Sequence, residues 1–122
     1  MIIVRNGQQH AFREGITEAF LRKMTVFFRS EFPEDLGDRS EPELRNELRP
    51  LFARARNYGF ETEGQVFIYL WAAIILGGDF DSEREPAREI LRSKRLTART
   101  KALWLSKWTL AVLETEEAPE PA

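Results

Sequence analysis

An uninterrupted run of eleven apolar residues, Val66 to Leu76, constrains the fold of this chain more than any other feature. The run is shorter than the roughly 20 residues that a helix needs to cross a bilayer. In front of it, Thr62 and Gln65 form a capping-box pattern, and Gly77-Gly78 behind it is a typical helix end. We therefore expect a helix over residues 62–76 that is buried on all sides within a soluble, cytoplasmic domain.

Four further helices are expected from the spacing of apolar residues and from helix-end signals. They begin between residues 10 and 17, after Ser40, near residue 86 and near residue 97, and they end at about residues 30, 58, 92 and 113. An acidic loop over 34–38 and a turn over 79–82 separate them. Pro50 removes one backbone N–H inside the second helix, so we expect a kink near Glu47 or a break there.

The chain is thus predicted to be one all-α domain, residues 1–113, built as a compact bundle of about five helices. Its N-terminus should be a short extended arm, and residues 114–122 should be a disordered acidic tail. The first helix is expected to bury one apolar stripe, which comprises Ile16, Phe20, Met24, Phe27 and Phe28.

The composition removes most catalytic and metal chemistry. The 122 residues include no cysteine and a single histidine, His10. Thiolate sites, histidine clusters and nucleophilic triads therefore lack their usual side chains. We predict a chain that is not an enzyme, with no catalytic residue, no metal ligand and no cofactor.

One acidic motif needs separate treatment, because Asp79, Asp81 and Glu83 alternate like the first ligands of a calcium loop. Such a loop also needs a glycine at its sixth position and a glutamate at its twelfth. Arg84 and Ile90 stand there instead. We expect Asp81, or the serine after it, to cap a helix N-terminus.

The formal net charge of −2 is an average over unlike segments. Residues 31–47 carry a net charge of −5, whereas residues 84–107 carry eight cations and two acids. The basic segment is compatible with a solvated surface, with a site for a protein partner, or with a nucleic-acid site on a helix-turn-helix. The turn over 93–97 lacks the usual glycine, and the nearby acidic tail would weaken phosphate binding.

The last helix carries more apolar surface than one core contact requires. At about 100° per residue, one ridge comprises Trp104, Leu105, Trp108, Ala111 and Val112, and a second comprises Leu103 and Leu110. Ser106, Lys107 and Thr109 are polar. Either this helix lies between two others, or a partner chain covers one ridge.

A set of residues between Arg54 and Leu91 resembles a family of small uncharacterised all-helical proteins. Their genes lie beside type VI secretion spike and effector genes in Gram-negative bacteria. The resemblance covers about 40 of the 122 residues, but Glu85-Pro86-Ala87 replaces the family's Pro-Trp-Ala segment, with a connection about two residues shorter. The residues that carry it are Arg54-Ala55, Tyr58-Gly59-Phe60, Thr62-Glu63, Val66, Tyr69-Leu70, Gly77, Asp79-Phe80-Asp81 and Ile90-Leu91.

The resemblance implies a protein that binds a cognate secreted effector, as an immunity protein that neutralises the toxin. The first alternative is an adaptor or chaperone that loads the effector onto the secretion spike, and the second is a small nucleic-acid-binding regulator. We expect no membrane partner, and nucleic acid only under the second alternative. The residues expected to bind the partner are Arg92, Arg95, Arg99, Lys101, Leu103, Trp104, Trp108 and Leu110.

Overall fold

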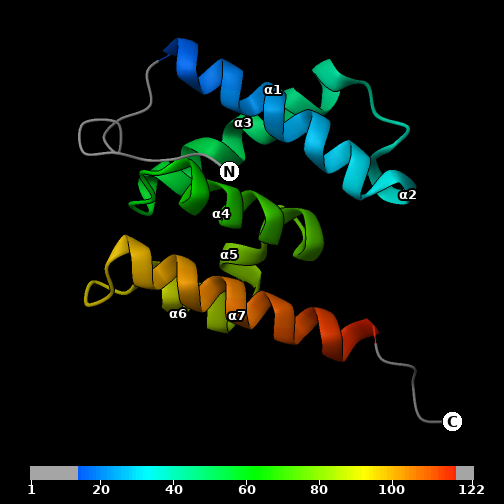
Figure 1. Cartoon of the computed structure of the whole chain (residues 1–122). Helices are drawn as coiled ribbons and strands as arrows, with labels where there is room; N and C mark the ends of the chain where they lie inside the picture. The colour runs from blue at the N-terminus through cyan, green and yellow to red at the C-terminus, as the bar shows by residue number, and fades with distance from the viewer. Residues whose placement is uncertain (1–13, 118–122) are drawn as a thin grey trace, which may run out of the picture.

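The computed structural model describes residues 14–117, and these form α-helices and connecting loops without a strand (Figure 1). The predicted all-α class is therefore confirmed. The predicted extended arm, residues 1–9, and residues 118–122 of the predicted tail lie outside the described range. The helices are α1 (Glu14–Glu31), α2 (Pro33–Leu36), α3 (Glu41–Asn57), α4 (Glu63–Leu76), α5 (Phe80–Glu83), α6 (Glu85–Arg92) and α7 (Ala98–Glu117).

The five predicted helices correspond to α1, α3, α4, α6 and α7, and two four-residue helices lie in segments that we expected to be irregular. One of them, α2, forms in the predicted acidic loop because Pro33 occupies its first turn and acidic side chains favour a helix N-terminus. The other, α5, occupies the predicted turn. At the C-terminal end, α7 continues through Glu117, so the prediction of disorder from residue 114 was wrong for these four residues. Glutamate is a good helix former, which favours this extension.

Local capping interactions determine where the longer helices begin and end. Two capping boxes are present, one of them the predicted pair of Thr62 and Gln65. In the other, the Ser40 hydroxyl accepts from the Glu43 backbone N–H at 3.2 Å. Gly59, just past the end of α3, has a φ of +99°, a conformation that side chains disfavour. The helix α3 passes through Pro50 without the predicted break, since Pro50 lies on the exposed face.

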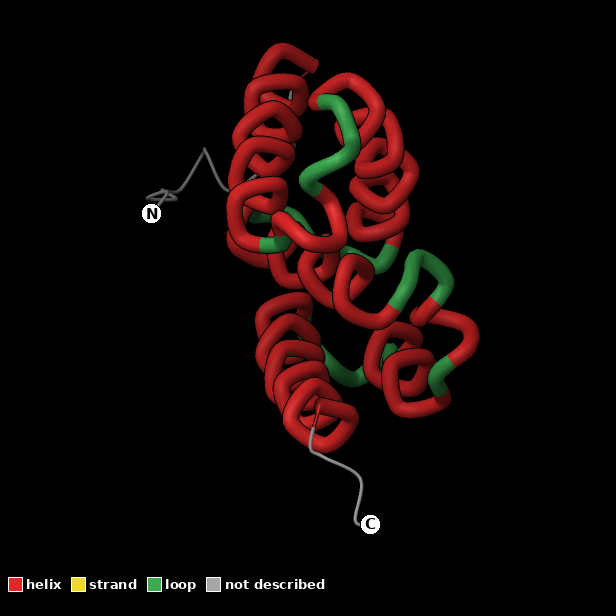
Figure 2. Tube along the Cα trace, turned by 90° about the vertical axis from the view of Figure 1, so that its right-hand side faces the viewer, coloured by secondary structure: helices red, strands yellow, loops and turns green. Residues whose placement is uncertain are grey.

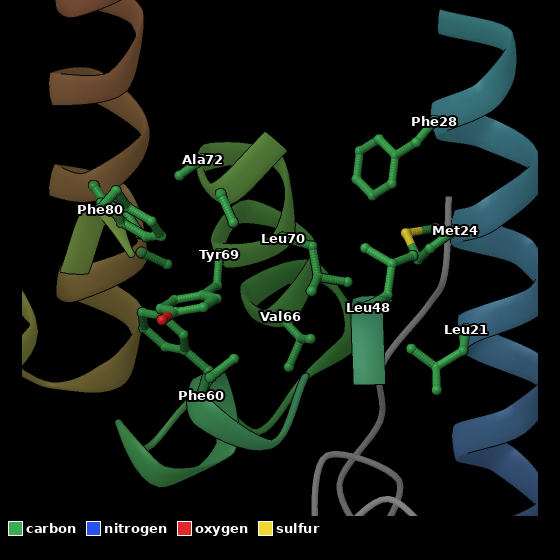
Figure 3. Close-up of a cluster of buried hydrophobic side chains, with 14 of the residues drawn as sticks. Leu21, Met24, Phe28, Leu48, Phe60, Val66, Tyr69, Leu70, Ala72 and Phe80 are labelled. Carbon is green, nitrogen blue, oxygen red and sulfur yellow. The ribbon is translucent and has the colours of Figure 1, made fainter. Parts of the chain in front are cut away.

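The helix α4 lies at the centre of the molecule. In Figure 1 it runs between α1 and α3 above it and α5, α6 and α7 below it, and Figure 2 shows the same stack turned by 90°. Figure 3 shows Leu70 facing Met24 and Phe28 of α1, while Tyr69 lies on the other side, near Phe60 and Phe80. No side chain of the apolar run is fully exposed, as expected for a helix that is apolar on every face.

The buried face of α1 is rotated from the predicted stripe. Phe20, Met24 and Phe28 are buried as expected, but Ile16 and Phe27 are 48% and 39% exposed. The buried face instead continues to Leu21 and Thr25. The Thr25 hydroxyl donates to the Leu21 carbonyl oxygen at 2.7 Å, and this hydrogen bond makes its burial tolerable.

None of the helices within residues 14–117 combines the length and the apolarity that spanning a bilayer requires.

Candidate functional site

Several of the residues that carry the family resemblance lie around the buried carboxylate of Asp81. Arg54, near the end of α3, donates to one carboxylate oxygen at 3.0 Å, and the Tyr58 hydroxyl donates to the other at 2.7 Å. The rings of Phe80 and Tyr69 lie beside this pair, with their centroids 5.1 Å apart. These contacts link α5 to α3 and α4, so we call Arg54, Tyr58, Tyr69 and Asp81 the Asp81 cluster.

The geometry of the Asp81 cluster is that of an internal structural contact. Asp81 is only 4% exposed, and both of its oxygens accept hydrogen bonds from the chain itself. The prediction that Asp81 or Ser82 caps a helix was wrong, because both residues lie inside α5. The N-cap positions of α5 and α6 are Asp79 and Arg84, and neither makes a capping side-chain hydrogen bond. Within residues 14–117, no three acidic or histidine side chains lie close enough together to hold a metal ion.

The two tyrosines of the Asp81 cluster differ in their hydrogen bonding. Burial, and then the hydrogen bond to Asp81, raise the pKa of Tyr58, and the positive charge of Arg92 partly offsets this. Burial and the charge of Asp81 also raise the pKa of Tyr69 well above its usual value. The Tyr69 hydroxyl nevertheless lies outside hydrogen-bond geometry with every group that the structure describes.

This difference predicts opposite outcomes for the same substitution. Tyr58→Phe should lower the free energy of unfolding by about 1–2 kcal/mol, because it removes a hydrogen bond to a charged acceptor. Tyr69→Phe should change stability by less than about 0.5 kcal/mol or raise it, since it removes a buried hydroxyl without a partner. Urea unfolding followed by circular dichroism measures both. Equal losses in the two variants would contradict this assignment.

The expected partner-binding cations lie at one end of the molecule. We define the basic end as Arg92, Lys94, Arg95 and Arg99, all of which are exposed. They surround the loop between α6 and α7, at the opposite corner of Figure 1 from the acidic helix α2. The two oppositely charged segments therefore do not neutralise each other within the fold.

Two hydroxyl groups hold the backbone of this loop. Ser93 Oγ accepts from the backbone N–H groups of Arg95 and Leu96, at 3.2 and 3.3 Å. Thr97 Oγ1 accepts from the backbone N–H of Thr100 at 3.2 Å and so caps α7. The basic end is thus presented on a preformed turn, which lowers the entropy cost of binding a partner.

The solvent side of α7 carries the apolar residues of the candidate site. Leu103, Trp104 and Leu110 are 49%, 50% and 47% exposed. Single exposed apolar residues are common on protein surfaces, whereas three on the same helix form a larger apolar area. The two predicted ridges are therefore divided differently: Leu105 is buried and Trp108 packs against the core, whereas Trp104 and Ala111 face outward. We define the α7 face as Leu103, Trp104, Lys107, Leu110 and Ala111, all of which are exposed.

Two of the expected partner-binding residues, Lys101 and Trp108, are only partly exposed. The Lys101 ammonium donates to the carbonyl oxygens of Leu91 at 2.8 Å and Tyr58 at 3.3 Å, so it joins α7 to the ends of α6 and α3. The structure brings the other six, Arg92, Arg95, Arg99, Leu103, Trp104 and Leu110, onto the exposed surface of α6, the following loop and α7.

Sequence reasoning missed the pairing of Arg54 and Tyr58 with Asp81. These residues are 27 and 23 positions from Asp81 in the chain, and charge and hydropathy patterns carry no signal for a contact at that distance. Only their membership in the same resemblance connected them.

A comparison of the chain with protein-family models, curated proteins and solved structures finds no match.

Proposed function

We propose that this chain is a non-enzymatic protein-binding module that holds a cognate type VI secretion effector in the cytoplasm, as an immunity protein. The observation that carries the proposal is the exposed basic end on its preformed turn, continuous with the apolar α7 face. Exposed apolar side chains bordered by cations are typical of surfaces that bind another protein. The assignment to an effector rests on the family resemblance.

The basic end supports an electrostatic mode of docking. Its four cations surround the loop between α6 and α7, and an acidic surface on the effector would be attracted to them before contact. Such complementarity increases the association rate more than it increases the final affinity. Neutralisation then follows from steric blocking of the toxin by a preformed helical surface.

Co-expression separates immunity from its alternatives. The immunity role predicts that this chain protects cells from the toxin encoded by a flanking gene and co-purifies with it. An adaptor would form the complex without protecting the cells. A nucleic-acid regulator would bind duplex DNA with an affinity that falls steeply with salt. Neither protection nor a complex with the product of either flanking gene would overturn the proposal.

Charge reversal at the basic end gives a quantitative prediction. Arg95→Glu should lower the association rate constant for the effector by about three- to tenfold, because it inverts one of the four steering charges. Surface plasmon resonance at low and at high salt measures the rate, and the effect should shrink at high salt. Arg22→Glu, an equal change of charge at an exposed site on α1, is the matched control. Equal rates for the two variants would place the interface elsewhere.

A further inference from the structure

The α7 face has a spacing that suits the packing of one helix against another. Leu103 and Leu110 are seven residues apart, as are Trp104 and Ala111, and all four are exposed. At about 100° per residue, the four lie within an arc of about 120°. This is the width of surface that a neighbouring helix covers, and no helix within residues 14–117 covers it.

Opposite charges stand at the two ends of this apolar stretch. Arg99 lies one turn before Leu103, and Glu114 lies one turn after Leu110, on the same side of α7. Both side chains are exposed, and neither forms an ion pair with a side chain that the structure describes. The α7 face is therefore basic at its start, apolar in its middle and acidic at its end.

This order is complementary to itself when the direction of the helix is reversed. If two copies of α7 pack antiparallel about a two-fold axis between residues 106 and 107, Leu103 of one copy meets Leu110 of the other. The same register places Arg99 opposite Glu114, at both ends of the contact. Trp104 and Ala111, at the other edge of the face, would pair about an axis one residue further along, between residues 107 and 108, so in this register they are offset by two residues. Apolar contact and charge thus agree on one alignment, and the large Trp104 lies near the small Ala111 of the other copy in it.

We propose that a second copy of this chain occupies the α7 face, in an antiparallel, two-fold symmetric dimer. A symmetric contact of this kind uses the same surface patch on both subunits. It accounts for three half-exposed apolar side chains on one helix. The dimer shares the α7 face and Arg99 with the surface proposed to bind the effector, whereas Arg92, Lys94 and Arg95 are not part of the register that joins the two copies.

Lys107 lies at the centre of the contact, where it would meet Ser106 and Lys107 of the other copy. Its aliphatic stem can cover the leucines while its ammonium extends into solvent. The like charges at the axis keep the dimer weak. We therefore expect a dissociation constant on the order of micromolar, as is typical of small interfaces.

A charge swap on the full-length chain tests this register. Sedimentation equilibrium over about 1–500 µM should show the wild type passing from monomer to dimer. Arg99→Glu alone and Glu114→Arg alone should each weaken the dimer about tenfold, because each places like charges together at both ends of the contact. An equimolar mixture of the two single variants should restore association, since every pair in the mixed dimer is again of opposite charge. Arg22→Glu should leave the dissociation constant unchanged.

Three results would overturn the proposal. The first is a wild type that remains monomeric throughout the concentration range, which would leave the α7 face to a different partner. The second is a dimer that Arg99→Glu and Glu114→Arg do not weaken. The third is a mixture of the two variants that stays as weakly associated as each variant alone. Each of these results concerns association of the chain with itself, whereas the proposed function is tested by protection and by association with the effector, so failure of this proposal is distinguishable from failure of the proposed function.

Discussion

Replacing Phe80 with alanine is expected to lower the free energy of unfolding by about 4 kcal/mol. The side chain is fully buried, and its ring lies 5.1 Å from that of Tyr69, between α4 and the C-terminal helices (Figure 3). Truncation removes the buried ring and leaves a cavity, since the helices around it relax only partly. For a domain of ordinary stability, about 5–15 kcal/mol, this is a large fraction of the total. Thermal unfolding should show a loss of about 15 °C.

Phe27→Ala is the matched control, because it makes the same chemical change on the exposed face of α1. Phe27 is 39% exposed and keeps edge contacts with Phe28 and Phe67, so we expect a loss of about 1 kcal/mol. The two variants should differ about fourfold in their effect on the free energy of unfolding. A Phe80→Ala variant no less stable than Phe27→Ala would contradict the placement of α5 in the core.

Asp81→Ala is expected to lower the free energy of unfolding by about 3 kcal/mol, the second largest of the expected effects. The substitution removes the acceptor for both the Arg54 guanidinium and the Tyr58 hydroxyl, at 3.0 and 2.7 Å. Tyr58 and Arg54 are partly buried, so water replaces the lost carboxylate only incompletely. Urea unfolding at neutral pH measures the loss.

Asp79→Ala is the matched control, because it removes a negative charge close to Arg54 without removing the buried carboxylate of Asp81. Asp79 lies 3.7 Å from the same guanidinium, but its side chain is 73% exposed. An exposed ion pair contributes little to stability, so we expect the free energy of unfolding to change by less than about 0.5 kcal/mol. Similar losses at positions 79 and 81 would show that the Asp81 cluster is not a specific buried contact.

The positions of the helices were largely predictable from the chain alone, because the signals that begin and end a helix act within a few residues. The hydroxyls of Ser40 and Thr62 satisfy backbone N–H groups three residues later, and Gly59 and Gly77 adopt positive φ just past their helices. The central place of α4 was predictable for a related reason. For a helix that is apolar on all sides, the most favourable position is one in which neighbouring elements cover every face and exclude water from it.

The two short helices were not predicted, and for Pro50 the sequence left a kinked helix and a broken helix as alternatives. In α3, the exposed position of Pro50 lets solvent serve the carbonyl that lacks its usual N–H partner, so the helix continues. In α5, burial of Phe80 and Asp81 holds four residues in helical form. An isolated helix of this length does not form in water, because the conformational entropy lost in the first turn exceeds the gain from its single hydrogen bond. Tertiary contacts therefore decided α5.

The sequence by itself determined the helical class, most ends of the long helices and the absence of cysteine chemistry, but not the C-terminal end of α7. Only the tertiary structure decided that Asp81 accepts from Arg54 and Tyr58, that Lys101 joins three helices, and that the solvent side of α7 carries Leu103, Trp104 and Leu110. The physical reason is one of range. Caps and helical periodicity act over three or four residues, whereas burial depends on which distant segments of the chain cover a given face.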